Sequence, residues 1–113
     1  SVVTCRLTHT YPDGLAPYFS YSAYAEPSTM IDVWKEIKIA TNEICVEEQG
    51  TVTHHHAVGR DHRVNGYDVQ RSEGFKDMLV SAKESIDPKG IMNPGVLIDP
   101  ANITIDHWMK KSK

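Results

Sequence analysis

The stretch that decides the fold is VVTCRLTHTYPDGLAPYFSYSAYA, residues 2–25. Its first part, Val2 to Tyr11, is rich in β-branched residues, which favour extended backbone. Pro12-Asp13-Gly14 has the composition of a tight turn, and Pro17 to Ala25 continues as a second strand. These residues therefore predict an antiparallel hairpin.

Each predicted strand has one side that is more apolar than the other, because successive side chains of a strand point to opposite faces. The apolar side of the first strand carries Val3, Cys5 and Leu7. One side of the second strand carries Phe19, Tyr21 and Ala23, and the other carries Tyr18, Ser20, Ser22 and Tyr24. The side that includes Tyr18 is expected to be the wetter one.

The rest of the chain predicts two helices and one more strand. Apolar residues recur at helical spacing from about residue 27 to residue 47 or 48, and again from about 69 to 86. Between them, the β-branched run at 51–56 predicts a third strand. The order strand, strand, helix, strand, helix predicts an α+β fold, with a ferredoxin-like antiparallel sheet and both helices on one face.

Three adjacent histidines, His54, His55 and His56, end the predicted third strand. In a strand, His54 and His56 would share one face and His55 would point to the other. Imidazoles on one surface can pass protons, hold an anion or bind a metal. No metal is expected, because zinc needs three or four ligands and no other Cys or His pair has suitable spacing. The plain alternative is that two rings are buried and hydrogen-bonded while the third is solvated.

The composition is that of a piece of a soluble intracellular protein. With 113 residues and 40% hydrophobic content, the chain can bury a modest core. A net charge of −3 gives no reason to expect nucleic acid as a partner. Cys5 and Cys45 are expected to be buried free thiols. Because Ser1 leads directly into a strand-like run, we expect the chain to be part of a larger protein.

An ordered set of motifs resembles the C-terminal part of the alkyldihydroxyacetonephosphate synthase family, flavoenzymes of the vanillyl-alcohol oxidase superfamily. The motifs are CRLTHTY (5–11), APYFSY (16–21), HHHAVG (54–59), EGF (73–75), KESIDPKGI (83–91) and NPG (93–95). The resemblance implies that residues 1–90 end a substrate-capping domain and that 91–113 form a tail toward an N-terminal flavin domain. Ala57 stands where the family usually has Gly.

The resemblance also implies a chemistry, in which a fatty alcohol replaces the acyl chain of acyl-dihydroxyacetone phosphate with FAD as cofactor. The implied catalytic residues are Tyr18, His54, His55 and His56, the implied substrate-binding residues are Arg60 and Arg63, and the implied cofactor contacts are His56 and Asn93. A tyrosine acts as an acid or base near neutral pH only with cations or imidazoles beside it, which fits this set.

Two alternatives remain open. Relatives of the same fold oxidise hydroxy acids or phenols, so the parent could be a FAD-dependent oxidoreductase. The chain could also be a non-catalytic cap fragment or binding module. The expected partners are the flavin-binding domain of the same protein, a small-molecule or lipid substrate, and a second copy of the chain. The expected location is intracellular, either cytoplasmic or peripherally membrane-associated, and peroxisomal in a eukaryote.

Overall fold

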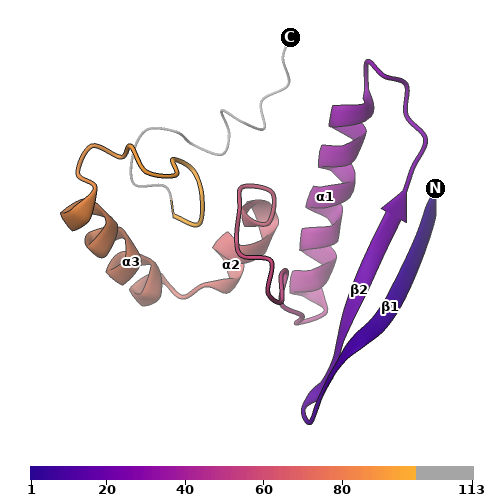
Figure 1. Ribbon diagram of the computed structural model, residues 1–113, viewed down its shortest axis with the longest axis horizontal. Helices are drawn as coiled ribbons and strands as arrows, with labels where there is room; N and C mark the ends of the chain where they lie inside the picture. The colour runs from indigo at the N-terminus through magenta and orange to yellow at the C-terminus, as the bar shows by residue number, and fades with distance from the viewer. Residues whose placement is uncertain (99–113) are drawn as a thin grey trace. The chain divides into compact units, whose positions relative to one another are not determined.

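The computed structural model describes residues 1–98, and the part of the chain beyond them, including most of the expected tail, lies outside the described residues. The chain divides into two compact units, one from Ser1 to Val33 and one that begins at Trp34. Strands β1 and β2 come first along the chain, and helices α1, α2 and α3 follow (Figure 1). The predicted α+β class is confirmed.

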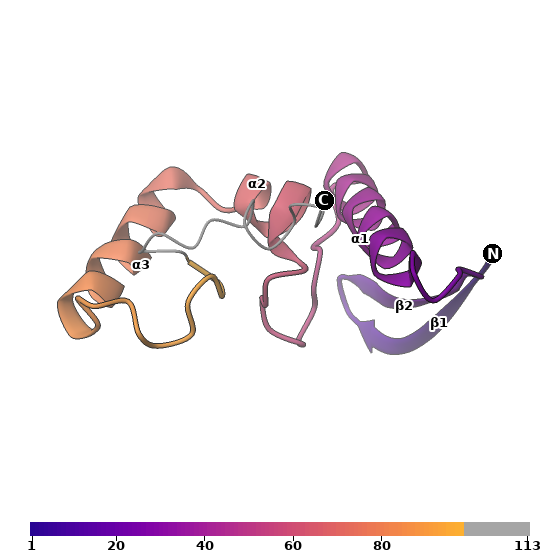
Figure 2. The same ribbon diagram turned by 90° about the horizontal axis from the view of Figure 1, so that it is seen from above.

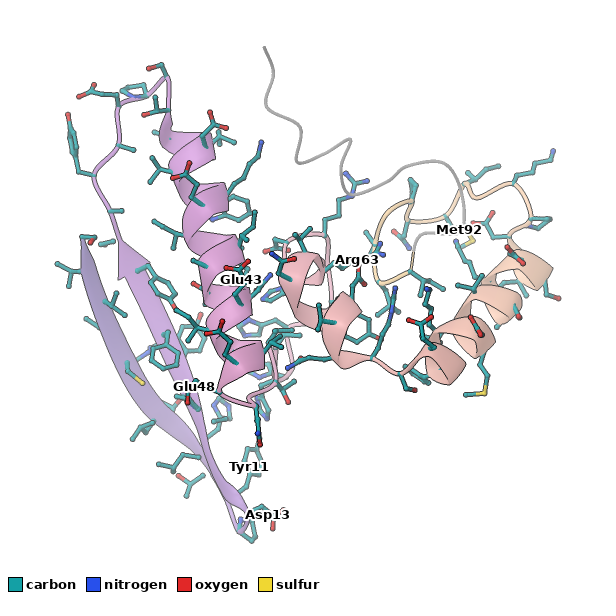
Figure 3. The ribbon with its side chains drawn as sticks, turned by 180° about the vertical axis from the view of Figure 1, so that it is seen from behind. Tyr11, Asp13, Glu43, Glu48, Arg63 and Met92 are labelled. Carbon is teal, nitrogen blue, oxygen red and sulfur yellow. The ribbon has the colours of Figure 1, made fainter. Side chains whose placement is uncertain are left out.

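The hairpin of the first unit is confirmed. Strand β1 (Val2–Tyr11) pairs antiparallel with β2 (Gly14–Ser22). Gly14 closes the turn at a φ of 143°, a backbone conformation that side chains with a Cβ rarely adopt. Tyr11 and Asp13 lie at this closed end of the hairpin (Figure 3).

The pairing register brings the predicted apolar sides together. Val3 lies opposite Tyr21 and Cys5 opposite Phe19, so these four side chains share one face. The register shifts just beyond Arg6, where β2 contains Pro17. Proline has no backbone N–H to give to the partner strand, which accounts for the irregularity at this point.

Both faces of the hairpin are open to solvent, which corrects one expectation. Cys5 is an exposed free thiol rather than a buried one, and Cys45 is only partly buried. Val3 and Phe19 are also exposed. The physical reason is that two strands alone form a sheet too narrow to bury the side chains on either of its faces.

Helix α1 (Met30–Glu47) matches the first predicted helix within a few residues. It ends where Gln49 takes a left-handed φ of 59°, and the Gly50 N–H donates to the Cys45 carbonyl at 2.8 Å. These features are typical of a helix C-terminus closed by a left-handed residue.

The third strand predicted over residues 51–56 is wrong. Within residues 1–98 only β1 and β2 pair, and 51–56 is a series of bends. A side chain takes the place of a partner strand, since Gln70 donates to the Gly50 carbonyl at 2.5 Å and accepts from the Val52 N–H at 3.3 Å. A β-branched run becomes a strand only where another strand is available to pair with it.

The second predicted helix is interrupted. An irregular turn, η1 (Arg63–Tyr67), whose backbone leaves the helical conformation from Val64 to Gly66, leads into the short α2 (Asp68–Gln70), and α3 (Glu73–Ile86) follows after a break. Figure 2 shows α2 and α3 as separate helices joined by an extended stretch. Arg71 is extended there, and the Ser72 hydroxyl caps α3 by accepting from the Phe75 N–H at 3.3 Å.

Burial in the described part of the chain is mostly polar. Asn42, Arg63 and Asp87 are buried, whereas Ile98 is the one buried hydrophobic side chain within residues 1–98. The second unit is therefore held together largely by hydrogen bonds from buried polar side chains to backbone groups. These bonds determine where the candidate site residues lie.

Candidate functional site

The rings of the three histidines contact one another in a cluster on the surface. The rings of His54 and His55 have centroids 4.8 Å apart, those of His55 and His56 are 4.3 Å apart, and both pairs are edge to face. The Nδ1 atoms of His54 and His55 lie 2.6 Å apart, so one ring must donate a proton to the other. All three residues are exposed. The predicted division of the rings between two strand faces is therefore wrong, and His55 lies in the middle of the cluster.

Ala57 ends the histidine run in a left-handed conformation, with a φ of 66°. Glycine adopts this conformation without cost, whereas an alanine Cβ crowds the neighbouring carbonyl. The departure from the family's usual glycine thus falls at a position where the backbone favours glycine. The fold keeps the turn despite the strain.

A buried amide fixes the segment that follows the histidines. Asn42 on α1 is 1% exposed, and its Nδ2 donates to the carbonyls of Asp61 and Val64, both at 2.9 Å. Beside it, Asn65 donates to Glu43 of α1 at 2.6 Å. Helix α1 is therefore bound to the 61–65 segment by two side-chain amides.

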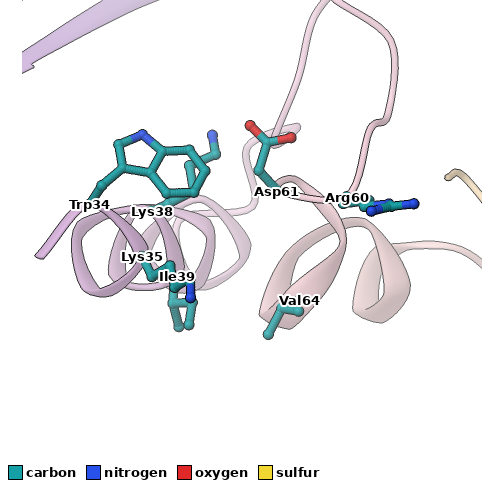
Figure 4. Close-up of a pocket in the computed structure, with 7 residues that line it drawn as sticks. All are labelled: Trp34, Lys35, Lys38, Ile39, Arg60, Asp61 and Val64. Atoms are coloured by element: carbon teal, nitrogen blue, oxygen red, sulfur yellow. The ribbon is translucent and has the colours of Figure 1, made fainter. Parts of the chain in front are cut away.

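A shallow hollow lies between α1 and this segment (Figure 4). It is lined by Trp34, Lys35, Lys38, Ile39, Arg60, Asp61 and Val64. Burial lowers the pKa of Lys38, while the nearby Asp61 carboxylate acts in the opposite direction. The Arg60 guanidinium points away from Trp34 in Figure 4.

His62 connects this hollow with the histidine cluster. Burial is the main reason that its pKa is lowered, and the charges of Lys38 and His56 lower it further, against the opposing effect of Asp61. The Nδ1 of His62 is 3.7 Å from the Asp61 carboxylate. His62 is therefore less easily protonated than an exposed imidazole.

Sequence reasoning misses both Lys38 and His62 as members of the site. Lys38 is one lysine among several on a helix, and nothing in the pattern marks it. His62 lies in the polar loop after the histidine run, and its place two residues beyond Arg60 is the signal that could have identified it.

The two predicted substrate-binding arginines are bound to the backbone near the end of the described chain. Arg60 donates from Nη2 to the Pro94 carbonyl at 2.7 Å, and Arg63 donates from Nη1 to the Gly95 carbonyl at 3.0 Å. Arg63 is 4% exposed, and its Nε also donates to both carboxylate oxygens of Asp68, at 3.1 and 3.2 Å. Their role toward a substrate stays a prediction.

A third arginine, Arg71, completes this arrangement. It donates to the Leu97 carbonyl at 3.0 Å and forms an ion pair with Asp68 at 3.1 Å. Its guanidinium also lies 5.4 Å from the centre of the Tyr67 ring. Asp68 thus neutralises two buried arginines, and three arginines in all hold carbonyls of the 94–97 segment.

Asp87 fixes the start of the same segment. Its carboxylate accepts from the N–H groups of Ile91 and Met92 at 3.0 and 2.9 Å and from the Lys83 ammonium. These three donors, the Lys83 ammonium first, lower the pKa of Asp87 to about 2. Lys83 also donates to the Met92 carbonyl at 2.5 Å.

The two remaining predicted site residues lie in different units. Tyr18 is on β2 in the first unit, where the Arg6 guanidinium stacks 4.5 Å from the centre of its ring. Asn93 is exposed in the second unit and has a left-handed φ of 47°. That Tyr18 acts in catalysis together with the histidines stays a prediction.

Two general features of the described residues bear on function. Residues 1–98 contain no group of three or more His, Cys, Asp or Glu side chains that could hold a metal ion. None of the helices in that range is both long and apolar enough to cross a membrane.

Comparison with known proteins assigns the family. The model of the FAD linked oxidases, C-terminal domain, matches residues 1–97, which is most of the chain. The chain belongs to this family. The resemblance seen in the sequence motifs is thereby confirmed.

Its curated relatives include synthases and an oxidoreductase. Over 101 residues it is 30% identical to an alkyldihydroxyacetonephosphate synthase of Trypanosoma brucei brucei, which covers 85% of this chain and 16% of that protein. A synthase of the same name from Dictyostelium discoideum is 31% identical over 96 residues, with the same two coverages. An uncharacterized FAD-linked oxidoreductase of Escherichia coli is 31% identical over 97 residues, covering 80% of this chain and 19% of that protein. The chain thus spans less than a fifth of these relatives. No solved structure matches it at a significant level.

Proposed function

We propose that this chain supplies the substrate-side groups of a FAD-dependent enzyme that exchanges the acyl chain of acyl-dihydroxyacetone phosphate for a fatty alcohol. The similarity to two synthases supports this reaction. The structural observation that supports it most is the exposed cluster of three imidazoles in edge-to-face contact, two of which are hydrogen-bonded to each other.

The chain's own residues fit proton transfer and the binding of an anion. A hydrogen-bonded histidine pair can give up or accept a proton without a change in ring position. Lys38 and Arg60 line the hollow that follows the histidine loop, and their positive charges would attract a phosphate or a carboxylate. Tyr18 would act as the acid or base on the leaving fatty acid, with its ring oriented by Arg6.

The described residues are suited to contact FAD from one side rather than to form its main binding site. Residues 1–98 include no glycine-rich dinucleotide fingerprint, whereas His56 and Asn93 lie on loops and are exposed. In line with the family, an N-terminal domain of the whole protein would hold FAD, which supplies the reactive ring next to the substrate. His56 and Asn93 would then contact the cofactor from this side.

A second candidate is a FAD-dependent oxidoreductase that acts on a hydroxy acid or a phenol. The name of the Escherichia coli relative favours it. The same histidine cluster could take the proton from a substrate hydroxyl during such an oxidation.

Two assays on the whole protein, loaded with FAD, separate these candidates. In the first, labelled hexadecanol and acyl-dihydroxyacetone phosphate are supplied, and the ether product and the released fatty acid are measured. In the second, hydroxy acids and phenols are screened for reduction of an artificial electron acceptor. Ether formation without acceptor reduction supports the synthase, and the reverse result supports the oxidoreductase. A protein that shows no flavin spectrum and neither activity would instead be a non-catalytic module.

A further inference from the structure

We propose that Arg60 is a positioning residue that joins the histidine loop, residues 54–60, to the Asn93 turn, residues 93–96, so that His56 and Asn93 are held in one arrangement. The inference rests on the proposed function, because that function gives His56 and Asn93 their roles beside FAD. The connection itself is independent of any role in catalysis.

The link is a single short hydrogen bond. Arg60 lies four residues after His56, and its Nη2 donates to the Pro94 carbonyl at 2.7 Å. Pro94 directly follows Asn93, and the turn is closed by the Val96 N–H, which donates to the Asn93 carbonyl at 3.2 Å. The Arg60 guanidinium is therefore bound to the residue that follows Asn93, and the Arg60 backbone lies four residues along the chain from His56.

The charge on Arg60 has a different environment from that of its neighbours. Arg63 and Arg71 share the carboxylate of Asp68, which compensates for their burial. Arg60 forms no ion pair within residues 1–98 and is only partly buried. A charged donor on a neutral carbonyl is stronger than an ordinary hydrogen bond, yet it neutralises nothing. Its contribution is to hold the turn in place.

The Asn93 turn needs such a restraint. Asn93 and Gly95 both have a positive φ, and Pro94 lacks an N–H, so the backbone makes few hydrogen bonds of its own. Arg63 holds the Gly95 side of the turn through η1, and the Asp87 carboxylate holds Met92 before it. Among residues 1–98, only Arg60 connects the turn to the loop that carries the histidines.

Amide hydrogen exchange in the whole protein tests the link, with exchange resolved at Arg63, whose N–H donates to the Arg60 carbonyl at 3.3 Å, and at Val96. Arg60→Gln should speed exchange at both amides by roughly tenfold or more, because a charged hydrogen bond that closes both segments is lost. Arg60→Lys keeps the charge and a donor and should restore most of the protection. Lys35→Gln is the matched control, since Lys35 lines the same hollow but makes no hydrogen bond within residues 1–98.

The outcomes are distinct. Faster exchange at Arg63 alone, or an equal rise throughout α3, would overturn the proposal. With FAD bound, Arg60→Gln should also shift the flavin absorbance spectrum, and Arg60→Lys should restore it. If the exchange result holds but His56→Ala and Asn93→Ala leave the flavin spectrum and turnover unchanged, the proposed function fails while the link between the two segments stands.

Discussion

The side chain of Asn42 lies directly against the backbone of Gly66. A Cβ at Gly66 would be 3.1 Å from the Asn42 Cγ and 3.1 Å from the Val52 Cγ1. The buried amide can reach the carbonyls of Asp61 and Val64 only because residue 66 has no side chain. This contact fixes the loop that follows the histidine cluster.

Removing the amide should destabilise the chain. Asn42→Ala leaves the carbonyls of Asp61 and Val64 without this donor and should lower the free energy of unfolding by about 2 kcal/mol. Gly66→Ala should also be destabilising, by roughly 1 to 3 kcal/mol through overpacking. Because both changes act at one contact, the double variant should lose less than the sum of the two, as urea unfolding would show. Glu43→Ala, which removes the exposed α1 carboxylate that Asn65 binds, is the control and should cost under about 1 kcal/mol. Strictly additive losses would mean that the two residues do not act on each other.

Ala57→Gly should stabilise the histidine loop. The left-handed φ of 66° strains an alanine by about 1 kcal/mol and does not strain a glycine. Thermal unfolding should therefore show that the free energy of unfolding of Ala57→Gly is higher by close to that value. Ala40→Gly on the exposed face of α1 is the matched control and should instead lose about 1 kcal/mol, since glycine weakens a helix. If both variants lose stability, the turn at residue 57 is not left-handed in solution.

Stability should fall in acid because of Asp87. Its pKa is about 2 in the fold and 3.8 without the fold, so the folded form binds fewer protons between these values. The stabilisation is complete above about pH 4 and is lost as the pH falls toward 2. Urea unfolding at a series of pH values should show this loss in the unaltered protein and a flatter profile in Asp87→Asn. Asp77→Asn, which removes an exposed carboxylate from α3, should keep the original profile.

The parts that the sequence predicts well depend on local patterns. The hairpin follows from alternation along β1 and β2 and from the turn residues, and its register confirms which side chains share a face. The run at 51–56 has the same local character, but a strand also requires a partner, and Gln70 binds that segment instead. The local sequence pattern cannot reveal that a side chain distant in sequence takes the place of a partner strand.

The candidate site shows the same limit. The histidine run is evident in the sequence. The edge-to-face contacts of His55 with both neighbouring rings, however, require a bent backbone, whereas the β-branched residues before the run predict an extended one. The partners of Arg60 and Arg63 could not be predicted, because backbone carbonyls such as that of Pro94 carry no sequence signature. The sequence pattern around an arginine in a polar loop is the same whether that arginine binds a ligand or a backbone carbonyl of its own chain.

His62 should make stability depend on pH near neutrality. Its pKa in the fold is below the usual 6.5, so the unfolded chain binds more protons, and stability should decrease as the pH falls below about 6.5. His62→Gln should reduce this dependence. In an NMR titration of the His62 ring, Lys38→Met should raise its pKa, although only in part, because burial is the larger cause. Lys35→Met, one turn earlier on the same helix, should leave it unchanged. A titration of His62 at or above 6.5 in the unaltered protein would contradict the assignment.

The edge-to-face contacts among the three histidines predict that His55 is as important for turnover as His56. His55 contacts both neighbouring rings and is hydrogen-bonded to His54, so its loss disconnects the other two. In the whole protein with FAD, His56→Ala and His55→Ala should each lower turnover by about 10²-fold, the usual scale for a lost general acid or base. Because all three rings are exposed, neither change should alter the melting temperature by more than a few degrees. His9→Ala, an exposed histidine on β1, is the control and should retain full turnover. If His55→Ala keeps nearly full turnover while His56→Ala does not, His56 acts alone and the contacts between the rings have no part in the reaction.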